Sequence, residues 1–91
     1  MEISPTELFN VISYFIEITM LVRNNSTKYQ AYYLMFLDLV IDTYSEEIKR
    51  HIYKSCDDFC KKYSKLQTPE SMSPQLCNII YHIYSHSLKN S

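Results

Sequence analysis

Residues 4–23, SPTELFNVISYFIEITMLVR, contain the clearest helix start in this chain and indicate its fold class. Ser4 stands at the N-cap, Pro5 at the first helical position, and Glu7 completes a capping box. At about 100° per residue, the apolar side chains cover an arc of about 200°. The remaining polar stripe is narrow and consists of Asn10, Ser13 and Glu17. We therefore expect a helix over residues 5–23 that is buried on more than one side.

The chain contains no glycine, and residues 27–66 contain no proline either. Because tight hairpin turns depend on residues with positive φ, this composition disfavours a β fold and suits helices joined by polar connections. Apolar residues within 27–66 recur at helical spacing, which fits either one long helix or two. We favour two, because Thr43–Glu46 form a second capping box and a helix of about 40 residues would find little to pack against.

The last helix begins at Ser73-Pro74, the same Ser-Pro start as in the first helix. Its inward positions are Leu76, Ile79, Ile80 and Ile83. The sequence therefore predicts a single all-α domain over residues 1–91, a small antiparallel bundle of three or four helices. The expected helices are 5–23, 27–42, 44–66 and 74–88, with one long helix as the alternative for the middle two.

The composition limits the classes of function. A net charge of −1 argues against general electrostatic attraction to nucleic acid or anionic membranes, which requires many excess cations. No signal peptide is visible at Met1–Pro5, and no apolar stretch reaches the roughly 20 residues that span a bilayer. Three cysteines, an odd number, fit a reducing compartment. We expect a soluble intracellular protein, in cytoplasm or nucleus, and its surplus of Ile, Asn, Lys and Tyr is typical of AT-rich genomes such as viral ones.

Two pairs of metal-ligating residue types stand at i, i+4 spacing, Cys56 with Cys60 and His82 with His86. In an antiparallel hairpin of the last two helices, the pairs would overlap in height within about one helical turn. Their angular positions, however, place cysteines and histidines on opposite edges of the hairpin, whereas zinc ligands converge to about 2.3 Å from one point. We therefore expect no metal ion, and a zinc site on these four residues is only an alternative.

The same hairpin brings two other pairs of side chains together. Cys60 and Cys77 should be neighbours on one edge, close enough to form a disulfide if oxidised. His51 should approach His86 on the other edge.

No catalytic constellation is evident. The opposite edges keep the thiols away from the imidazoles, and a chain without glycine has no glycine-rich phosphate loop. Asp38 and Asp42 are spaced i, i+4, but an ordinary polar stripe on a helix explains them. We expect a non-enzymatic protein with no cofactor and no small-molecule substrate.

The stretch that best suggests a binding surface is Tyr29–Phe36. Its aromatic side chains recur at i, i+3, i+4 and i+7, on a different face from Leu34, Leu37 and Ile41, and a helix with two apolar faces has to bury both. Because tyrosine is enriched at protein interfaces, we expect the aromatic face to be an interaction surface, with the domain's own core as the alternative place for these rings. The residues are Tyr29, Tyr32, Tyr33 and Phe36.

These features together predict a protein-interaction or assembly module that forms a homodimer or binds another protein, with a host-directed viral binder as one form. An alternative is a nucleic-acid-associated protein that uses the basic cluster Lys61, Lys62 and Lys65. Acidic residues on the same face argue against it, because pairs such as Glu46–Arg50 and Asp57–Lys61 make an ordinary solvated helix surface.

Overall fold

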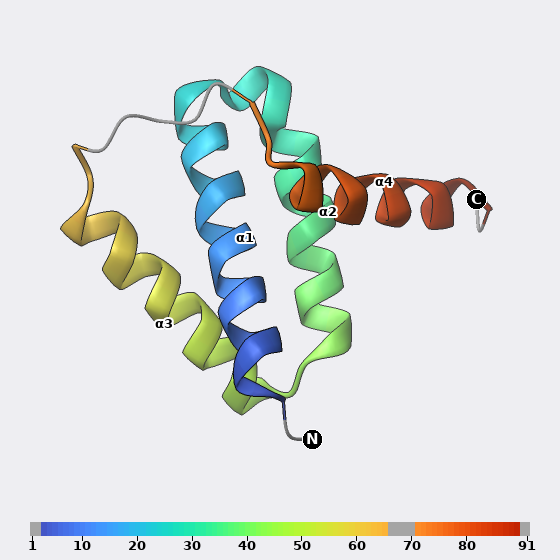
Figure 1. Ribbon diagram of the computed structural model, residues 1–91. Coiled ribbons are helices and arrows are strands. Elements are labelled where there is room, and N and C mark those ends of the chain that lie inside the picture. Colours follow the sequence, from blue (N-terminus) through green and yellow to red (C-terminus); the bar gives the residue numbers. More distant parts are fainter. Residues whose placement is uncertain (1–2, 66–70, 90–91) are drawn as a thin grey trace.

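The computed structural model describes residues 3–65 and 71–89, without the side chains of 83, 84 and 86–89, and these residues form four helices (Figure 1). The helices are α1 (Pro5–Asn24), α2 (Ser26–Thr43), α3 (Glu46–Lys62) and α4 (Pro74–Lys89). The all-α fold and the break between the second and third helices are therefore confirmed. α3 begins two residues later and ends four residues earlier than predicted.

Side-chain caps explain where α1 and α3 begin. The Ser4 hydroxyl accepts a hydrogen bond from the Glu7 amide at 3.1 Å, as the capping box predicts. The Glu7 carboxylate accepts a hydrogen bond from the Tyr44 hydroxyl, also at 3.1 Å, so it ties α1 to the α2–α3 connection. The cap of α3 is Ser45 and not Thr43, because the Ser45 hydroxyl accepts from the amide three residues further on, at 3.4 Å.

A single residue, Asn25, joins α1 to α2 and caps both helices. Its amide donates to the Leu21 carbonyl at 2.9 Å and closes α1, and its side-chain oxygen accepts from the Lys28 amide at 3.2 Å and opens α2. The φ angle of Asn25 is −149°, a conformation that requires no glycine. The chain thus reverses direction between two packed helices without a residue of positive φ.

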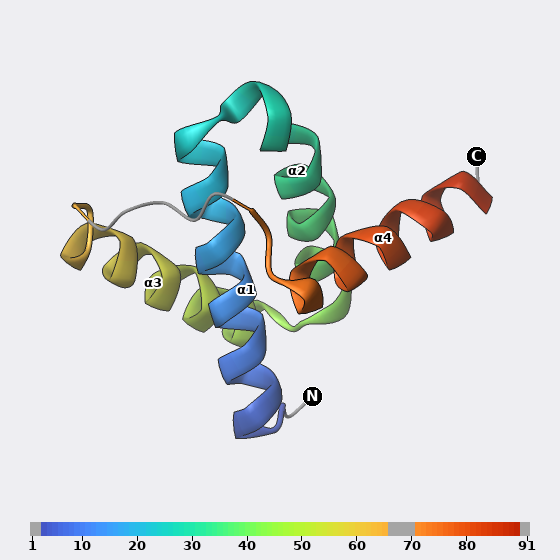
Figure 2. The same cartoon turned by 45° about the horizontal axis from the view of Figure 1, so that its top comes forward.

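α1 is the central helix of the bundle: α2 and α3 both pack against it, and α4 packs against α2 (Figures 1 and 2). The Phe15 ring of α1 makes edge-to-face contacts with Tyr33, Phe36 and Tyr53, each with ring centroids 5.8 Å apart. Five large aliphatic side chains are fully buried: Ile18, Leu21, Val40, Ile52 and Leu76. Because they come from all four helices, one core joins the described part of the chain.

α3 and α4 do not form the predicted hairpin. They lie on opposite sides of α1, and α4 projects away from the other helices in both views (Figures 1 and 2). The start of α4 is held by α1, because the Glu17 carboxylate accepts hydrogen bonds from both the amide and the hydroxyl of Ser73. This contact uses the polar stripe of α1 and directs α4 away from α3.

α2 buries its aromatic face in preference to its aliphatic one. Tyr29 and Phe36 are buried, whereas Leu34 and Ile41 are 47% and 44% exposed. The aromatic rings bury more apolar area than the aliphatic side chains and interlock with Phe15, which favours this orientation. The aliphatic stripe of Leu34 and Ile41, which the sequence analysis expected to be buried like the aromatic face, is therefore partly exposed.

Candidate interaction groove

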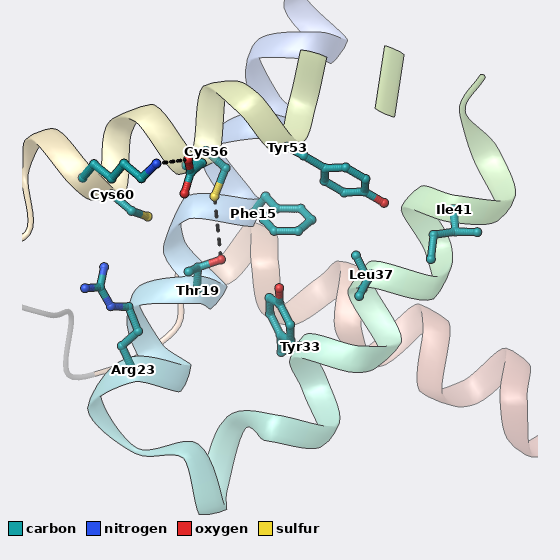
Figure 3. Close-up of a pocket in the computed structure, with 11 residues that line it drawn as sticks. Phe15, Thr19, Arg23, Tyr33, Leu37, Ile41, Tyr53, Cys56 and Cys60 are labelled. Carbon is teal, nitrogen blue, oxygen red and sulfur yellow. Dashed lines mark hydrogen bonds and ion pairs between the residues drawn. The ribbon is translucent and has the colours of Figure 1, made fainter. Parts of the chain in front are cut away.

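An open groove runs along α1 between α2 and α3 (Figure 3). Phe15 and Thr19 of α1 form its floor, and α2 and α3 form its walls because they diverge from their connection at residues 44–45. The groove has a volume of about 630 Å³ and is lined by four further apolar or aromatic side chains, Tyr33, Leu37, Ile41 and Tyr53. In a regular four-helix bundle a fourth helix fills this position, but here α4 packs on another face of α2.

The α3 wall of the groove carries two thiols one helical turn apart, Cys56 and Cys60. Cys56 is buried, and its Sγ lies 3.7 Å from the Thr19 hydroxyl oxygen, within hydrogen-bond distance for sulfur. Burial raises the pKa of Cys56 to about 12, although the Thr19 hydrogen bond opposes the rise. A thiol with this pKa is protonated at neutral pH and is a poor nucleophile, so Cys56 acts here as a small apolar lining group.

Tyr33 and Tyr53 bring phenol groups into the apolar lining (Figure 3). Burial raises the pKa of Tyr33, with smaller contributions from Cys56 and Tyr53. The Tyr33 phenol therefore stays neutral at physiological pH and offers one donor and one acceptor to an occupant of the groove. Rings with a polar tip suit an interface that is apolar at its centre and polar at its rim.

Positive charge lies at one end of the groove. Arg23 is at the end near Cys60, away from Leu37 and Ile41 (Figure 3). Lys61, the residue after Cys60, also lines the groove and forms an ion pair with Asp57 at 2.8 Å, with both side chains largely exposed. The groove is therefore apolar over most of its length, with a polar rim, an arrangement typical of surfaces that bind an amphipathic helix.

The predicted aromatic interaction surface is divided between core and groove. Tyr29 and Phe36 are only 4% and 2% exposed, so they belong to the core and are not accessible to a partner. Tyr32 is half-buried beside Tyr29, and Tyr33 lines the groove. The α1 and α3 sides of the groove were not predicted, since no sequence signal places α3 beside α1. The apolar residues Leu37 and Ile41, one helical turn apart, were a usable signal for the α2 side.

The candidate zinc ligands are not gathered in one place. Cys56 and Cys60 line the groove from α3, whereas His82 is exposed on α4, on the other side of α1. The His86 side chain lies outside the described residues, as does the predicted contact between His51 and His86. Among the residues that the structure describes, no group of three or more His, Cys, Asp or Glu side chains is placed to hold a metal ion.

The expected neighbourhood of Cys60 and Cys77 depended on the α3–α4 hairpin, which is not formed. Both residues are free thiols, Cys60 half-buried in the groove and Cys77 exposed at the start of α4. The Cys77 thiol lies 3.8 Å from the Met72 carbonyl oxygen, a weak contact with the chain just before its own helix.

Two of the three lysines in the basic cluster, Lys61 and Lys62, make contacts with neighbouring side chains. Lys61 pairs with Asp57, as predicted from their spacing, and the Lys62 ammonium lies 5.4 Å from the centroid of the Tyr63 ring. Lys65 is exposed. The Asp57 carboxylate offsets one of the three positive charges of the cluster, which weakens that alternative.

The rest of the outer face of α3 carries ion pairs of mixed sign. Lys54 pairs with Asp58 at 2.8 Å, and Glu46 pairs with Lys49 at 2.6 Å in place of the expected Arg50. The hydrogen bond from Lys49 lowers the pKa of Glu46. Both side chains of the Lys54–Asp58 pair are exposed, so this pair contributes little to stability. The Lys49 side chain, in contrast, is only 13% exposed.

No protein-family model matches the chain, and no curated protein or solved structure is significantly similar to it. Within the described ranges, none of the helices has the length and apolar character needed to cross a membrane. The geometry of the groove is therefore the basis for assigning a function.

Proposed function

We propose that this chain is a non-enzymatic protein-interaction module that binds an amphipathic helix in the groove over α1. The observation that carries the proposal is the unfilled helix position: two helical walls and a Phe15 floor enclose about 630 Å³ of mostly apolar space. Helix-in-groove recognition uses surfaces of this kind, with apolar anchors at i, i+3, i+4 and i+7 of the bound helix.

The chemistry of the lining supports binding over catalysis. The Cys56 thiol is protonated at neutral pH, and the Asp57 carboxylate is already paired with Lys61. A nucleophile needs an adjacent base or a lowered pKa, and the raised pKa of Cys56 is the opposite condition. The intracellular location and the viral origin remain predictions from composition, and the three free thiols are consistent with a reducing compartment.

A peptide titration followed by amide NMR tests this function. The probe is a synthetic helical peptide with leucine at i, i+3, i+4 and i+7 and lysine and glutamate elsewhere. The control peptide has the same composition with its leucines spread around the helix. We expect the first peptide alone to shift the amides of Phe15, Tyr33, Leu37 and Cys56, because only a continuous apolar face fits the groove.

Two substitutions locate the binding surface. Leu37→Glu, inside the groove, should abolish the shifts, whereas Phe9→Glu should leave them unchanged, since Phe9 is 69% exposed and lies outside the groove lining. Circular dichroism confirms that each variant is folded. Absent shifts, equal shifts with both peptides, or shifts confined to α4 would contradict the proposed function.

A further inference from the structure

The end of the groove near Arg23 adjoins a second, smaller hollow. Arg23 and Cys60 line both spaces, so the two are continuous at these residues (Figure 3). The second hollow has a volume of about 190 Å³ and is bordered by the C-terminal ends of α1 and α3. Its other lining residues are Met20, Asn24, Phe59, Tyr63 and Ser64. Because Asn24 and Ser64 are polar, this end of the groove offers hydrogen-bonding groups next to the Arg23 guanidinium.

Arg23 carries a positive charge that no ion pair offsets within residues 3–65 and 71–89. The charged side chains that line the groove are Arg23, Asp57 and Lys61. Asp57 and Lys61 pair with each other at 2.8 Å, and Arg23 belongs to none of the ion pairs in the described ranges. The groove lining therefore has one excess positive charge, and it lies at the end where the second hollow begins.

The chemistry of a guanidinium determines which group pairs with it best. A guanidinium is planar and has five N–H donors, which match the two oxygens of a carboxylate. Beside apolar walls such a charge-assisted hydrogen bond is stronger than in open water. The Arg23 side chain is exposed, so a bound molecule can reach it without displacing a partner within the described residues.

We propose that the helix bound in the groove carries an acidic side chain one turn beyond its apolar anchors, and that this carboxylate pairs with Arg23. The inference rests on the proposed function and adds to it the chemistry of the partner. With anchors at i, i+3, i+4 and i+7, an aspartate or glutamate on the same face stands at i−4 or i+11. The apolar anchors then supply most of the affinity, and Arg23 determines which amphipathic helices bind and in which direction they lie.

Isothermal titration calorimetry with three helical peptides tests the pairing. All three have leucine at i, i+3, i+4 and i+7 and capped ends without terminal charges. They differ only at i−4 and i+11, where both residues are glutamate, glutamine or lysine, so that a carboxylate is available whichever way the helix lies. We expect the glutamate peptide to bind about two- to fivefold more tightly than the glutamine peptide, and the lysine peptide to bind most weakly.

Substitutions at Arg23 identify the residue responsible. Arg23→Gln should remove the preference for the glutamate peptide, and Arg23→Glu should make the lysine peptide the tightest of the three. The matched control is Arg50→Gln, because Arg50 is also exposed and lies outside the groove lining, so it removes the same charge elsewhere. This variant should keep the preference of the unsubstituted chain. Peptides are compared on one variant at a time, so a change in the stability of α1 cancels from the ratio of affinities.

The two proposals fail separately. If the glutamate and glutamine peptides bind equally well, or if Arg50→Gln lowers the preference as much as Arg23→Gln, the pairing with Arg23 is overturned while helix binding in the groove stands. If none of the three peptides binds, the proposed function is rejected and the inference with it.

Discussion

Phe15 serves the core and the candidate site at once. Its ring contacts Tyr33, Phe36 and Tyr53 edge to face, and such pairs contribute about 0.5–1.5 kcal/mol each beyond the area they bury. The same ring forms the floor of the groove. The sequence placed Phe15 on the apolar arc of its helix, but the spacing of apolar residues cannot distinguish a ring that is enclosed from one that also borders a groove.

The burial of an apolar residue of α1 determines how much its truncation lowers the free energy of unfolding. Ile18 is fully buried and Phe9 is 69% exposed. We expect Ile18→Ala to lower the free energy of unfolding by about 2–5 kcal/mol, because it leaves a cavity in a core that joins the helices. Phe9→Ala should change it by less than about 0.5 kcal/mol, as surface substitutions usually do. Urea denaturation measures both, and equal losses would contradict the packing described for α1.

The raised pKa of Tyr44 predicts how the free energy of unfolding changes at alkaline pH. Burial, followed by the hydrogen bond to Glu7, raises the pKa of Tyr44 to about 12 from an ordinary 10.0. The folded state thus keeps a proton that the unfolded chain loses, so this stabilisation is complete below pH 10.0 and is lost as the pH rises towards 12. The pKa of Cys56 is likewise raised, to about 12 from 9.0. The stabilisation that it contributes is also lost as the pH rises, and the loss begins nearer pH 9.0.

The free energy of unfolding should therefore fall between pH 9.0 and about 12. Tyr44→Phe removes one of the titrating groups, so its stability should fall less steeply above pH 10.0. Denaturation curves at several alkaline pH values measure the slope. An unchanged slope in Tyr44→Phe would show that this phenol does not contribute.

At the scale of the helices, boundaries are largely predictable and neighbours are not. The Ser4 cap follows from a local pattern, because a cap acts within one turn of its own helix. The α3–α4 hairpin was expected because helices consecutive in sequence usually pack together. Glu17 overrides that expectation by binding Ser73, 56 residues away, and nothing in the sequence marks the two as partners. The groove was therefore predictable only through the stripe on α2, since its other wall depends on where α3 packs.

The attachment of α4 depends on its N-terminal cap. The Ser73 hydroxyl donates to Glu17 at 2.8 Å and accepts from the Leu76 amide at 3.2 Å. Hydrogen bonds to charged groups contribute about 1.5–3 kcal/mol, so Glu17→Ala should loosen α4 from the bundle. We expect faster hydrogen exchange at the Ile80 amide and little change at Ile52, which is buried in α3.

Glu17→Gln provides the control for this prediction. Its side-chain carbonyl keeps one acceptor for Ser73, so the increase in exchange should be smaller than in Glu17→Ala. Exchange that rises equally in α1, α3 and α4 would indicate general destabilisation and contradict a local role for Glu17.

The molecule as a whole is an asymmetric bundle. One core joins the four helices. α2 and α3 pack on α1, while α4 packs on α2 and projects outward, which leaves the groove open between α2 and α3 (Figures 1 and 3). Its radius of gyration is 13.2 Å, against about 12 Å for a compact domain of this length. Leu37 and Ile41 of the aliphatic stripe on α2 line the open groove, so a helix bound there would contact them.

Amide NMR spectra of the chain with the helical peptide test the central claim, that the groove binds an amphipathic helix, most directly. As the peptide is added, we expect the amides of Phe15, Tyr33, Leu37 and Cys56, which line the groove, to shift together. The amides around Phe9 and along α4 should remain constant. A spectrum that does not change as the peptide is added, or changes confined to α4 and Phe9, would contradict helix binding in the groove.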